Sequence, residues 1–255
     1  MMMMYIQKEE NDMSGHVLIT GASRGIGRST AAAFAQKGYS LTLCCRNGIE
    51  ALARFSESLC RTCNTDVQCM RTDVGDPAQV NDLVSNAQAA FGPVDILINN
   101  AAVSSTGLVT DLSDEAWSRI LNTNLSSVFY MSRAVLPAMI HRKSGTIINI
   151  SSVFGICGAS CEAAYAASKG GVNAFTRSLA KELAPSRIRV NAIAFGVIDT
   201  QMNDNLTEEE KAALAEEIPA GRFASPDEAA SFILQIAQSP DYLTGQVIRF
   251  DGGWC

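Results

Sequence analysis

The sequence contains only two histidines, and this scarcity restricts the chemistry that it can support. The segment Gly21-Ala-Ser23-Arg-Gly25 fits the G-x-S-x-G nucleophile elbow of α/β-hydrolases, which also need an acid and a later histidine. Only His141 lies downstream, in a His-Arg-Lys run that is typical of a solvated basic patch. The sequence therefore disfavours a hydrolase.

Long apolar runs and an excess of positive charge are also missing. No apolar run approaches the roughly 18 residues that a membrane-spanning helix needs. Residues 1–10 lack the basic start and apolar core of a signal peptide. The formal net charge of -6 argues against a general affinity for nucleic acid or anionic membranes. We therefore expect a cytoplasmic protein with neither nucleic acid nor membrane as a partner.

Cysteine is not scarce, but the eight cysteines lack the spacing of a metal site. Cys60-x-x-Cys63 would suit a redox or metal site, yet no second pair and no histidine stands at ligand spacing. We expect reduced cysteines that act as small hydrophobes, and no metal.

What the chain does contain is an alternation of short apolar runs with helical stretches. Its 255 residues, 47% of them hydrophobic, can bury a sizeable core, and no repeat or linker divides them. This alternation is typical of a parallel sheet with helices on both faces. We expect one domain over 15–255, preceded by a flexible extension over 1–14. The predicted strands are 17–20, 40–44, 67–71, 94–98, 146–150, 189–194 and 246–250.

The central segment is Val17-Leu-Ile-Thr-Gly21-Ala-Ser-Arg-Gly25-Ile-Gly27. It predicts a buried strand, a turn whose glycines let the backbone approach a ligand, and the start of a helix. Amide donors and the positive end of the helix dipole would then suit a pyrophosphate, while Gly27 would let the helix pack closely on the strand. The spacing is not the G-x-G-x-x-G of the best-known dinucleotide folds, so the interpretation needs support from other residues.

The residues after the second predicted strand indicate which dinucleotide is bound. An acid there would bind the ribose 2′-hydroxyl of NAD, whereas an arginine accommodates the 2′-phosphate of NADP. The acid is missing and Arg46 is present, and Arg24 can supply a second cation, so we expect NADP(H). Asp73-Val74 could bind an adenine amino group, and Asn99-Asn100-Ala101-Ala102 could let a cofactor approach the backbone. Each also fits an ordinary turn after a strand.

The strongest chemical signal is Tyr165-Ala-Ala-Ser168-Lys169, on a predicted helix that continues to Leu183. Residues four apart share a helix face, so the phenol and the ammonium can act on the same space. A free tyrosine titrates near pH 10, roughly, and a nearby cation lowers its pKa. Tyr165 could then exchange a proton with a carbonyl or alcohol oxygen. The plain alternative is a surface tyrosine and lysine one turn apart.

Two polar residues support the chemical interpretation. Ser152 follows the fifth predicted strand and could hold the reacting oxygen against the phenol. Asn124 lies within a predicted helix, where asparagine has poor propensity, and could hold a water that relays protons to Lys169. The plain alternatives are a turn serine and a helix irregularity satisfied by local hydrogen bonds.

In this order and spacing the motifs resemble the short-chain dehydrogenase/reductase family, over nearly the whole chain from about Gly15 to Gly253. The matching motifs are Thr20-Gly-x-x-x-Gly-x-Gly27, Asp73-Val74, Asn99-Asn100-Ala101, Asn124, Ser152 and Tyr165-x-x-x-Lys169. Within the family the chain is most similar to the 3-oxoacyl-[acyl-carrier-protein] reductases of fatty acid synthesis. That similarity lies in 21–27, 123–129, 218–222, 242–246 and 251–253.

The resemblance implies an α/β single-domain Rossmann fold with a doubly wound seven-stranded parallel sheet, usually in a homotetramer, with NADP(H) across the strand ends. It implies that Tyr165 donates the proton as hydride reaches a ketone carbon, and that Ser152 orients the oxygen. Lys169 would lower the tyrosine pKa and bind the nicotinamide ribose, and Asn124 would anchor a relay water. The expected cofactor residues are Gly21, Ser23, Arg24, Gly25, Ile26, Gly27, Arg46, Asp73, Val74, Asn100, Ala101, Tyr165, Lys169, Ile198 and Thr200.

Some positions depart from the family pattern or extend it. Ala102 replaces a usual glycine, and Phe195-Gly196 replaces the usual Pro-Gly, which puts the following loop in doubt. Residues 204–222 resemble the mobile substrate lid, although a plain surface helix would look alike. His141-Arg-Lys143 and Arg187-x-Arg189 occur where carrier-protein reductases dock an acidic carrier, but ordinary solvated charges explain these cations as well.

These observations predict an NADPH-dependent reductase of a 3-oxoacyl thioester held by acyl-carrier protein. The same catalytic residues would equally serve a dehydrogenase for a hydroxysteroid, a sugar, a polyol or another secondary alcohol. A cofactor-binding sensor without turnover is the alternative from another class, and the intact set of catalytic residues argues against it.

Overall fold

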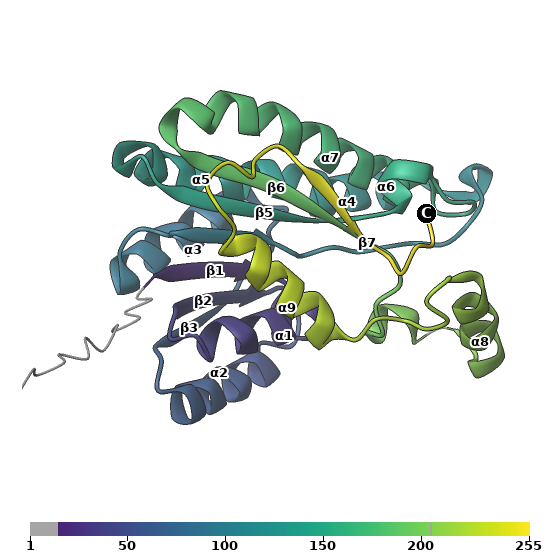
Figure 1. The fold of residues 1–255 in the computed structure, drawn as a ribbon, viewed down its shortest axis with the longest axis horizontal. Helices are drawn as coiled ribbons and strands as arrows, with labels where there is room; N and C mark the ends of the chain where they lie inside the picture. Colours follow the sequence, from purple (N-terminus) through teal and green to yellow (C-terminus); the bar gives the residue numbers. More distant parts are fainter. Residues whose placement is uncertain (1–14, 205) are drawn as a thin grey trace, which may run out of the picture.

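The computed structural model describes residues 15–204 and 206–255; the predicted extension over residues 1–14 lies outside the described part. Seven parallel strands form one sheet in the order β3-β2-β1-β4-β5-β6-β7 (Figure 1). The first strand, β1, lies near the middle of the sheet, and β2 and β3 follow on one side of it. The next strand, β4, pairs with the other side of β1. Open α/β sheets bind ligands at such a reversal. The predicted doubly wound Rossmann fold is confirmed.

Every predicted strand is present. The bounds are β1 (His16–Thr20), β2 (Ser40–Cys45), β3 (Val67–Arg71), β4 (Ile96–Asn99), β5 (Gly145–Ser152), β6 (Ile188–Phe195) and β7 (Val247–Phe250). β5 and β6 run further than predicted because they stay paired to Ser152 and Phe195. β1 and β6 are buried along their whole length, since helices cover both faces of a parallel sheet.

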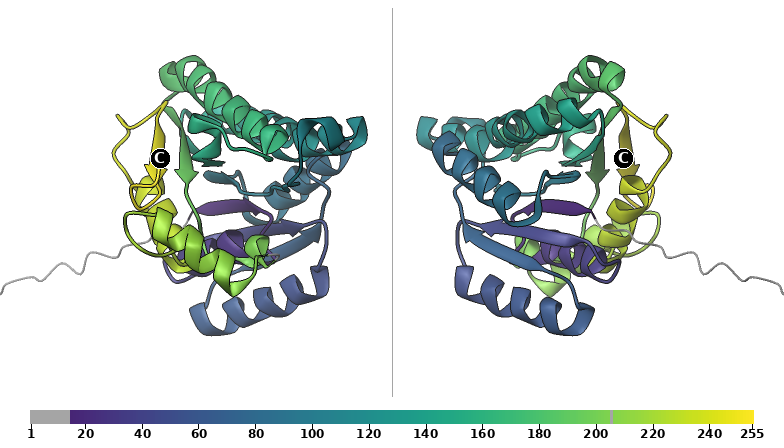
Figure 2. Two further views of the ribbon diagram at one scale, coloured as in Figure 1. Left: turned by 90° about the vertical axis from the view of Figure 1, so that its right-hand side faces the viewer. Right: turned by 90° about the vertical axis from the view of Figure 1, so that its left-hand side faces the viewer.

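Helices lie on both faces of the sheet (Figure 2). On one face α1 (Gly25–Ala35), α2 (Ile49–Cys63) and α9 (Pro226–Ala237) pack in one core with Val17 and Ile19. On the other, α3 (Pro77–Phe91), α5 (Ser127–Arg142) and α7 (Ala163–Leu183) pack in a second core with Leu18. The remaining helical elements are η1 (Val109–Asp111), α4 (Asp114–Leu121), η2 (Asn122–Ser126), α6 (Phe154–Cys157), η3 (Ala184–Ser186), η4 (Gln201–Asn203) and α8 (Glu208–Glu217).

The helix ends follow the capping residues. Asp76 accepts a hydrogen bond from the Ala78 amide at the start of α3. Capping boxes start α8 and α9, with Thr207 and Ser225 as the N-caps. The residues of α8 are all at least partly exposed, and this helix stands apart from the sheet at the right of Figure 1.

Arg189 corrects one prediction. It was expected to be an exposed docking cation, but its side chain is 6% exposed. Its guanidinium donates hydrogen bonds to the carbonyls of Ile236 and Ala237, the last residues of α9, and to the Thr146 hydroxyl. A cation at a helix C-terminus is stabilised by the helix dipole, so this arginine serves the fold.

The replacement at Phe195 is accommodated within a regular strand end. The buried ring packs edge-on against Phe250, with 5.6 Å between ring centroids. The Phe195 carbonyl accepts a hydrogen bond from the Val153 amide at 3.0 Å. The next residue, Gly196, lies so close to Asp251 that a Cβ would come within 2.9 Å of its Cα. β7 therefore constrains the chain as it leaves β6.

Two composition-based expectations bear on the fold. Among the described residues, no helix has both the length and the apolar character that crossing a membrane requires. None of the eight cysteines, all of which lie in the described part of the chain, forms a disulfide.

Candidate active site

The glycine turn after β1 forms a hollow, here called the cradle, that contains Gly21, Gly25 and Gly27. A Cβ atom at Gly21 or Gly27 would collide with the neighbouring chain. Gly21 and Gly25 adopt φ values of 66° and 54°, which favour glycine. A Cβ on Gly27 would lie 2.5 Å from the Gly21 carbonyl oxygen, so α1 packs directly on the turn, as predicted. The cradle opens at the N-terminus of α1, where unpaired amides and the helix dipole favour an anion. A dinucleotide pyrophosphate fits this chemistry.

The end of β4 is fastened to this cradle. The Asn100 side-chain amide donates hydrogen bonds to the carbonyls of Thr20 and Gly21, at 2.9 and 3.1 Å. The Thr20 hydroxyl accepts hydrogen bonds from the amides of Asn100 and Ala101. Asn100 thus positions the glycine turn, in agreement with a turn after β4. The cofactor contact predicted for Asn100 and Ala101 stays a prediction.

At the other end of the cradle, Arg46 follows β2 and Asp73 follows β3. Their side chains form an ion pair at 3.7 Å, and both are partly exposed. Arg24, the N-cap residue of α1, is also exposed. Ser23 in the glycine turn lies close enough to Cys45, the last residue of β2, to lower the pKa of its thiol. Two arginines therefore stand at the edge where the 2′-phosphate was predicted.

Of the remaining residues predicted to contact the cofactor, three are part of the hydrophobic core and one faces the glycine cradle. Val74 and Ile198 are 5% and 6% exposed, and Ile26 packs against the core, so any cofactor contact involves mainly their backbone. Thr200 lies across the cradle, where a Cβ on Gly25 would stand 3.2 Å from its Cγ2. The loop after β6 therefore reaches the glycine turn.

Ser152 and Tyr165 meet at the carboxyl end of β5. Ser152 is the last residue of β5, and its side chain lies close enough to the Tyr165 phenol to lower the pKa of that phenol. The Phe154 amide donates to the Ser152 oxygen at 3.2 Å and fixes its position. The predicted proximity of the serine and the phenol is therefore present in the structure.

The pKa of Tyr165 is raised to about 12, whereas the sequence predicted a lowered value. Burial is the main cause, because it disfavours the phenolate, and the charge of Glu162 adds to it. The effect of Ser152 acts in the opposite direction and is weaker. Tyr165 is therefore protonated at neutral pH and can donate a proton.

Lys169 lies one turn further along α7 and is 2% exposed. Its Nζ donates a hydrogen bond to the Ile150 carbonyl at 2.8 Å and lies 5.5 Å from the centroid of the Tyr165 ring. Burial lowers the pKa of Lys169 to about 8. The prediction that Tyr165 and Lys169 share a helix face is confirmed. Loss of solvent around both groups, however, outweighs the expected lowering of the tyrosine pKa by the lysine.

Asn124 lies in η2, a π-helical turn between α4 and α5. Its side chain exchanges two hydrogen bonds with the backbone of Val103, each 2.8 Å long, and donates a third to Ser168 at 3.1 Å. The predicted irregularity of the helix at Asn124 is confirmed. The hydrogen-bond partners of its side-chain amide, Val103 and Ser168, are distant in the sequence rather than local. π-Turns are frequent at functional sites.

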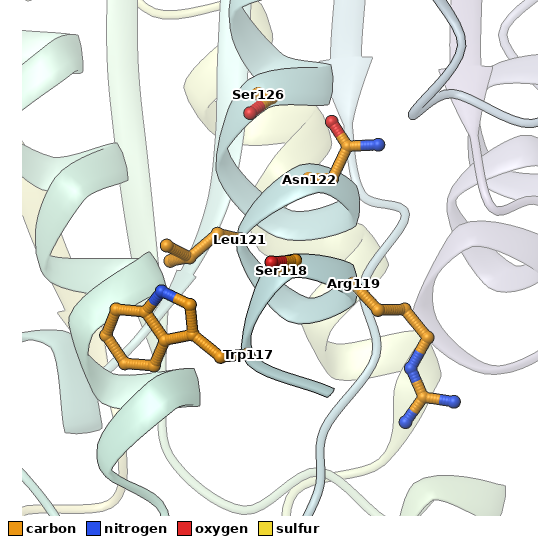
Figure 3. Close-up of a pocket in the computed structure, with 6 residues that line it drawn as sticks. All are labelled: Trp117, Ser118, Arg119, Leu121, Asn122 and Ser126. Carbon is orange, nitrogen blue, oxygen red and sulfur yellow. The ribbon is translucent and has the colours of Figure 1, made fainter. Parts of the chain in front are cut away.

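Two grooves on the described part of the surface are lined by residues other than Ser152, Tyr165 and Lys169. One of about 500 Å³ follows α4 and η2 (Figure 3), where Trp117 and Leu121 point to one side of the helix and Arg119 and Asn122 to the other. A second, of about 410 Å³, lies between α5 and α7. Neither groove is lined by Ser152, Tyr165 or Lys169, so we do not assign the reacting substrate to them.

A glycine cradle at the reversal of the sheet, together with a protonated tyrosine beside a serine at the carboxyl end of β5, is typical of a nucleotide-dependent oxidoreductase of the Rossmann type. A family model described as short chain dehydrogenase matches residues 15–211. The chain belongs to the short-chain dehydrogenase family. Members of this family use NAD(H) or NADP(H).

Whole-length relatives agree with this assignment. The chain is 38% identical to an uncharacterized oxidoreductase, YmfI, of Bacillus subtilis, over 95% of this chain and 99% of the relative. It is 39% identical to the 3-oxoacyl-[acyl-carrier-protein] reductase FabG of Thermotoga maritima, over 92% and 96%. The FabG of Escherichia coli is 38% identical, over 92% and 95%.

Proposed function

We propose that the protein is an NADPH-dependent reductase of 3-oxoacyl thioesters held by acyl-carrier protein. The observation that carries the reductase proposal is the placement of the protonated Tyr165 hydroxyl beside Ser152 and Lys169 at the carboxyl edge of the sheet. The substrate class is supported by the relatives that are named 3-oxoacyl-[acyl-carrier-protein] reductases.

The glycine cradle fits the cofactor, because a turn without side chains leaves its backbone amides accessible to a phosphate. A Cβ at Gly21 or Gly27 would collide with the neighbouring chain. In the proposed complex Gly21, Gly25 and the N-terminus of α1 hold the pyrophosphate. Arg24 and Arg46 bind the 2′-phosphate, with Arg46 leaving its 3.7 Å pairing with Asp73. NADPH, when bound, supplies the hydride for the ketone carbon.

The side chains on β5 and α7 handle the ketone oxygen. Ser152 donates a hydrogen bond that holds this oxygen against Tyr165. Tyr165 transfers its hydroxyl proton to the oxygen as negative charge develops there. Lys169 then stabilises the phenolate, since a cation near the ring favours its charged form. Asn124, fixed by Val103 and Ser168, stands where a relay water to Lys169 is proposed.

The test follows NADPH oxidation by absorbance with acetoacetyl thioesters of carrier protein and of coenzyme A, beside ketosteroids and keto sugars. Each assay is repeated with NADH. Reduction of the thioesters, with a clear preference for NADPH, is the expected result. Turnover of another ketone with inert thioesters would leave the catalytic residues in their roles and transfer the function to a different secondary alcohol.

The sensor without turnover remains the alternative from another class. The grouping of Tyr165 with the buried side chains of Ser152 and Lys169 favours an enzyme, because a sensor has no need of a proton donor at this position. Replacing Tyr165 with phenylalanine discriminates the two. An enzyme loses turnover and keeps NADPH binding, whereas a sensor shows no tyrosine-dependent turnover with any ketone.

Self-association is part of the proposal. The groove between α5 and α7 exposes Phe129 and Ile140, with exposed fractions of 42% and 44%. The buried hydroxyl of Ser132 also lines it and has no hydrogen-bond partner among the described residues. We propose that further copies of the chain cover this face in a homotetramer. His141, Lys143 and Arg187 remain candidates for contact with an acidic carrier protein. The cytoplasmic location also remains a prediction.

A further inference from the structure

A carboxylate beside the catalytic side chains has no part in the proposed proton transfer. Glu162 is the N-cap residue of α7, so it stands three residues before Tyr165 and seven before Lys169. Side chains with this spacing share one face of a helix. Glu162 therefore stands at the N-terminal end of the same row that carries the phenol and the ammonium.

The position of the carboxylate is set by the loop that follows β4. The Thr106 hydroxyl donates a hydrogen bond to Glu162 Oε1 at 3.1 Å. The Gly107 amide donates to the Cys161 carbonyl at 2.8 Å, which fastens the loop to the start of α7. The other carboxylate oxygen, Oε2, is buried and has no hydrogen-bond partner among the described residues.

An ionised oxygen in this position is costly unless something donates to it. Burial raises the pKa of Glu162 and the Thr106 hydrogen bond opposes this shift; no cation of the described residues is among the groups that move it. The charge of Glu162 in turn raises the pKa of Tyr165, so the carboxylate acts within electrostatic reach of the reacting hydroxyl. A buried polar atom without a partner calls for an explanation, and a donor group of a bound substrate provides one beside the catalytic side chains.

We propose that Glu162 is a specificity-determining residue whose Oε2 accepts a hydrogen bond from an N–H or O–H group of the substrate. The inference rests on the proposed ketone reductase activity and deepens it. Thioesters of a carrier's cysteamine arm provide such a donor as an amide N–H, and small hydroxyketones provide it as a hydroxyl.

Matched substrate pairs separate the donor from the rest of the molecule. The first pair is acetoacetyl-N-acetylcysteamine and the acetoacetyl thioester of 2-acetoxyethanethiol, in which an ester oxygen replaces the N–H. The second pair is 1-hydroxybutan-2-one and pentan-3-one, in which a methyl group replaces the hydroxyl. The quantity measured is the ratio of kcat/KM values within each pair.

The variants are Glu162→Leu, which removes the acceptor at similar volume, and Glu162→Gln, which keeps a neutral acceptor oxygen. Glu57→Leu on the exposed face of α2 is the matched control for loss of one carboxylate. Comparing ratios between proteins cancels the intrinsic reactivity of each ketone. We expect Glu162→Leu to lower the donor preference about 10- to 100-fold, the range for a hydrogen bond to a charged group, and Glu162→Gln to lower it less. Glu57→Leu should leave it unchanged.

Each outcome decides between the two proposals. If thioesters are reduced and the ratio does not depend on residue 162, the thioester function stands and the role of Glu162 is overturned. A Glu162-dependent ratio found only in the hydroxyketone pair supports Glu162 and overturns the thioester substrate. If the wild-type protein reduces no ketone, both fail. Should Glu162→Leu not fold, as judged by circular dichroism, an unchanged ratio in Glu162→Gln overturns the role of Glu162.

Discussion

The two halves of the candidate active site are built in different ways. The cofactor half, from β1 to β4, is made of backbone: glycines at positive φ and an asparagine amide that holds two carbonyls. The catalytic half, on β5 and α7, is made of side chains: Ser152 and Lys169 are buried, and loss of solvent shifts the pKa values of Tyr165 and Lys169. The first half should therefore be sensitive to added atoms, and the second to changes in chemical groups.

The largest effect should follow from Tyr165→Phe in the catalytic half. This change removes one hydroxyl and leaves the ring in place, so the proton donor is lost while the packing is kept. We expect kcat for ketone reduction to fall about 1000-fold, within the range for general acid catalysis. The affinity for NADPH, measured by its fluorescence, should change less than about threefold.

This result would be contradicted by turnover that stays within a factor of ten of wild type. In that case another group would donate the proton, and the division between the two halves would fail. Ser152→Ala, which removes the partner hydroxyl, gives an independent check because it should lower kcat without unfolding the protein.

The next effect should follow from Gly27→Ala in the cofactor half. The added Cβ would stand 2.5 Å from the Gly21 carbonyl oxygen and 2.6 Å from the Asn100 amide nitrogen. Because backbone cannot yield cheaply, we expect a loss of about 1–3 kcal/mol in the free energy of unfolding. NADPH affinity should fall at least about tenfold, since the cradle is displaced.

Gly107→Ala is the matched control, because its Cβ would meet no atom within 4 Å. Urea denaturation and NADPH titration of both variants test the pair. Equal NADPH affinities in Gly27→Ala and wild type would contradict the assignment of the cradle to the cofactor.

The same division explains how much could be predicted from the sequence. Strand alternation and glycine spacing report backbone geometry directly, so the sheet, the cradle and the close contact at Gly27 were predicted correctly. The pKa of Tyr165 was not, because burial depends on elements that are distant in the chain. Arg189 was expected on the surface for a similar reason, since its partners on α9 are brought together only by the fold.

Asn124 and Glu162 show which features of the site could be predicted from the sequence and which could not. The helix irregularity at Asn124 was predictable from its poor propensity, but its partner Val103 was not, since no local pattern links them. Glu162 was missed although its spacing to Tyr165 and Lys169 placed it on their face. A carboxylate at that spacing from a predicted general acid is a usable sequence signal for later work on similar chains.

A smaller effect should follow from Arg46→Gln, which sharpens the comparison within the cofactor half. The change removes a proposed 2′-phosphate contact and leaves the cradle intact. We expect the ratio of kcat/KM values for NADPH over NADH to fall about tenfold, mainly through the KM for NADPH, since one charge-assisted hydrogen bond is lost. Arg54→Gln, on the exposed side of α2, is the control. A ratio that does not respond to Arg46 would remove this arginine from the 2′-phosphate site.

The smallest effect concerns a titrating group outside both halves. His16 begins β1, and its ring nitrogens bond to the Gly92 carbonyl and the Thr42 hydroxyl, both at 2.9 Å. Burial lowers the pKa of His16 and outweighs the Gly92 hydrogen bond and Asp95, which raise it. In the unfolded chain the pKa returns to about 6.5.

Because the folded pKa of His16 is the lower one, the unfolded chain binds a proton first as the pH falls. The free energy of unfolding should therefore be highest above about pH 6.5 and decrease as the pH falls from there through the folded pKa. Urea denaturation at pH 7.5 and 5.5 should show a smaller decrease in His16→Asn than in the wild type, although the variant itself is less stable. Equal decreases in both proteins would assign the pH dependence to other groups. Since His16 lies at the amino end of β1, away from Gly21 and Tyr165, its protonation should alter stability and leave kcat of the folded enzyme unchanged.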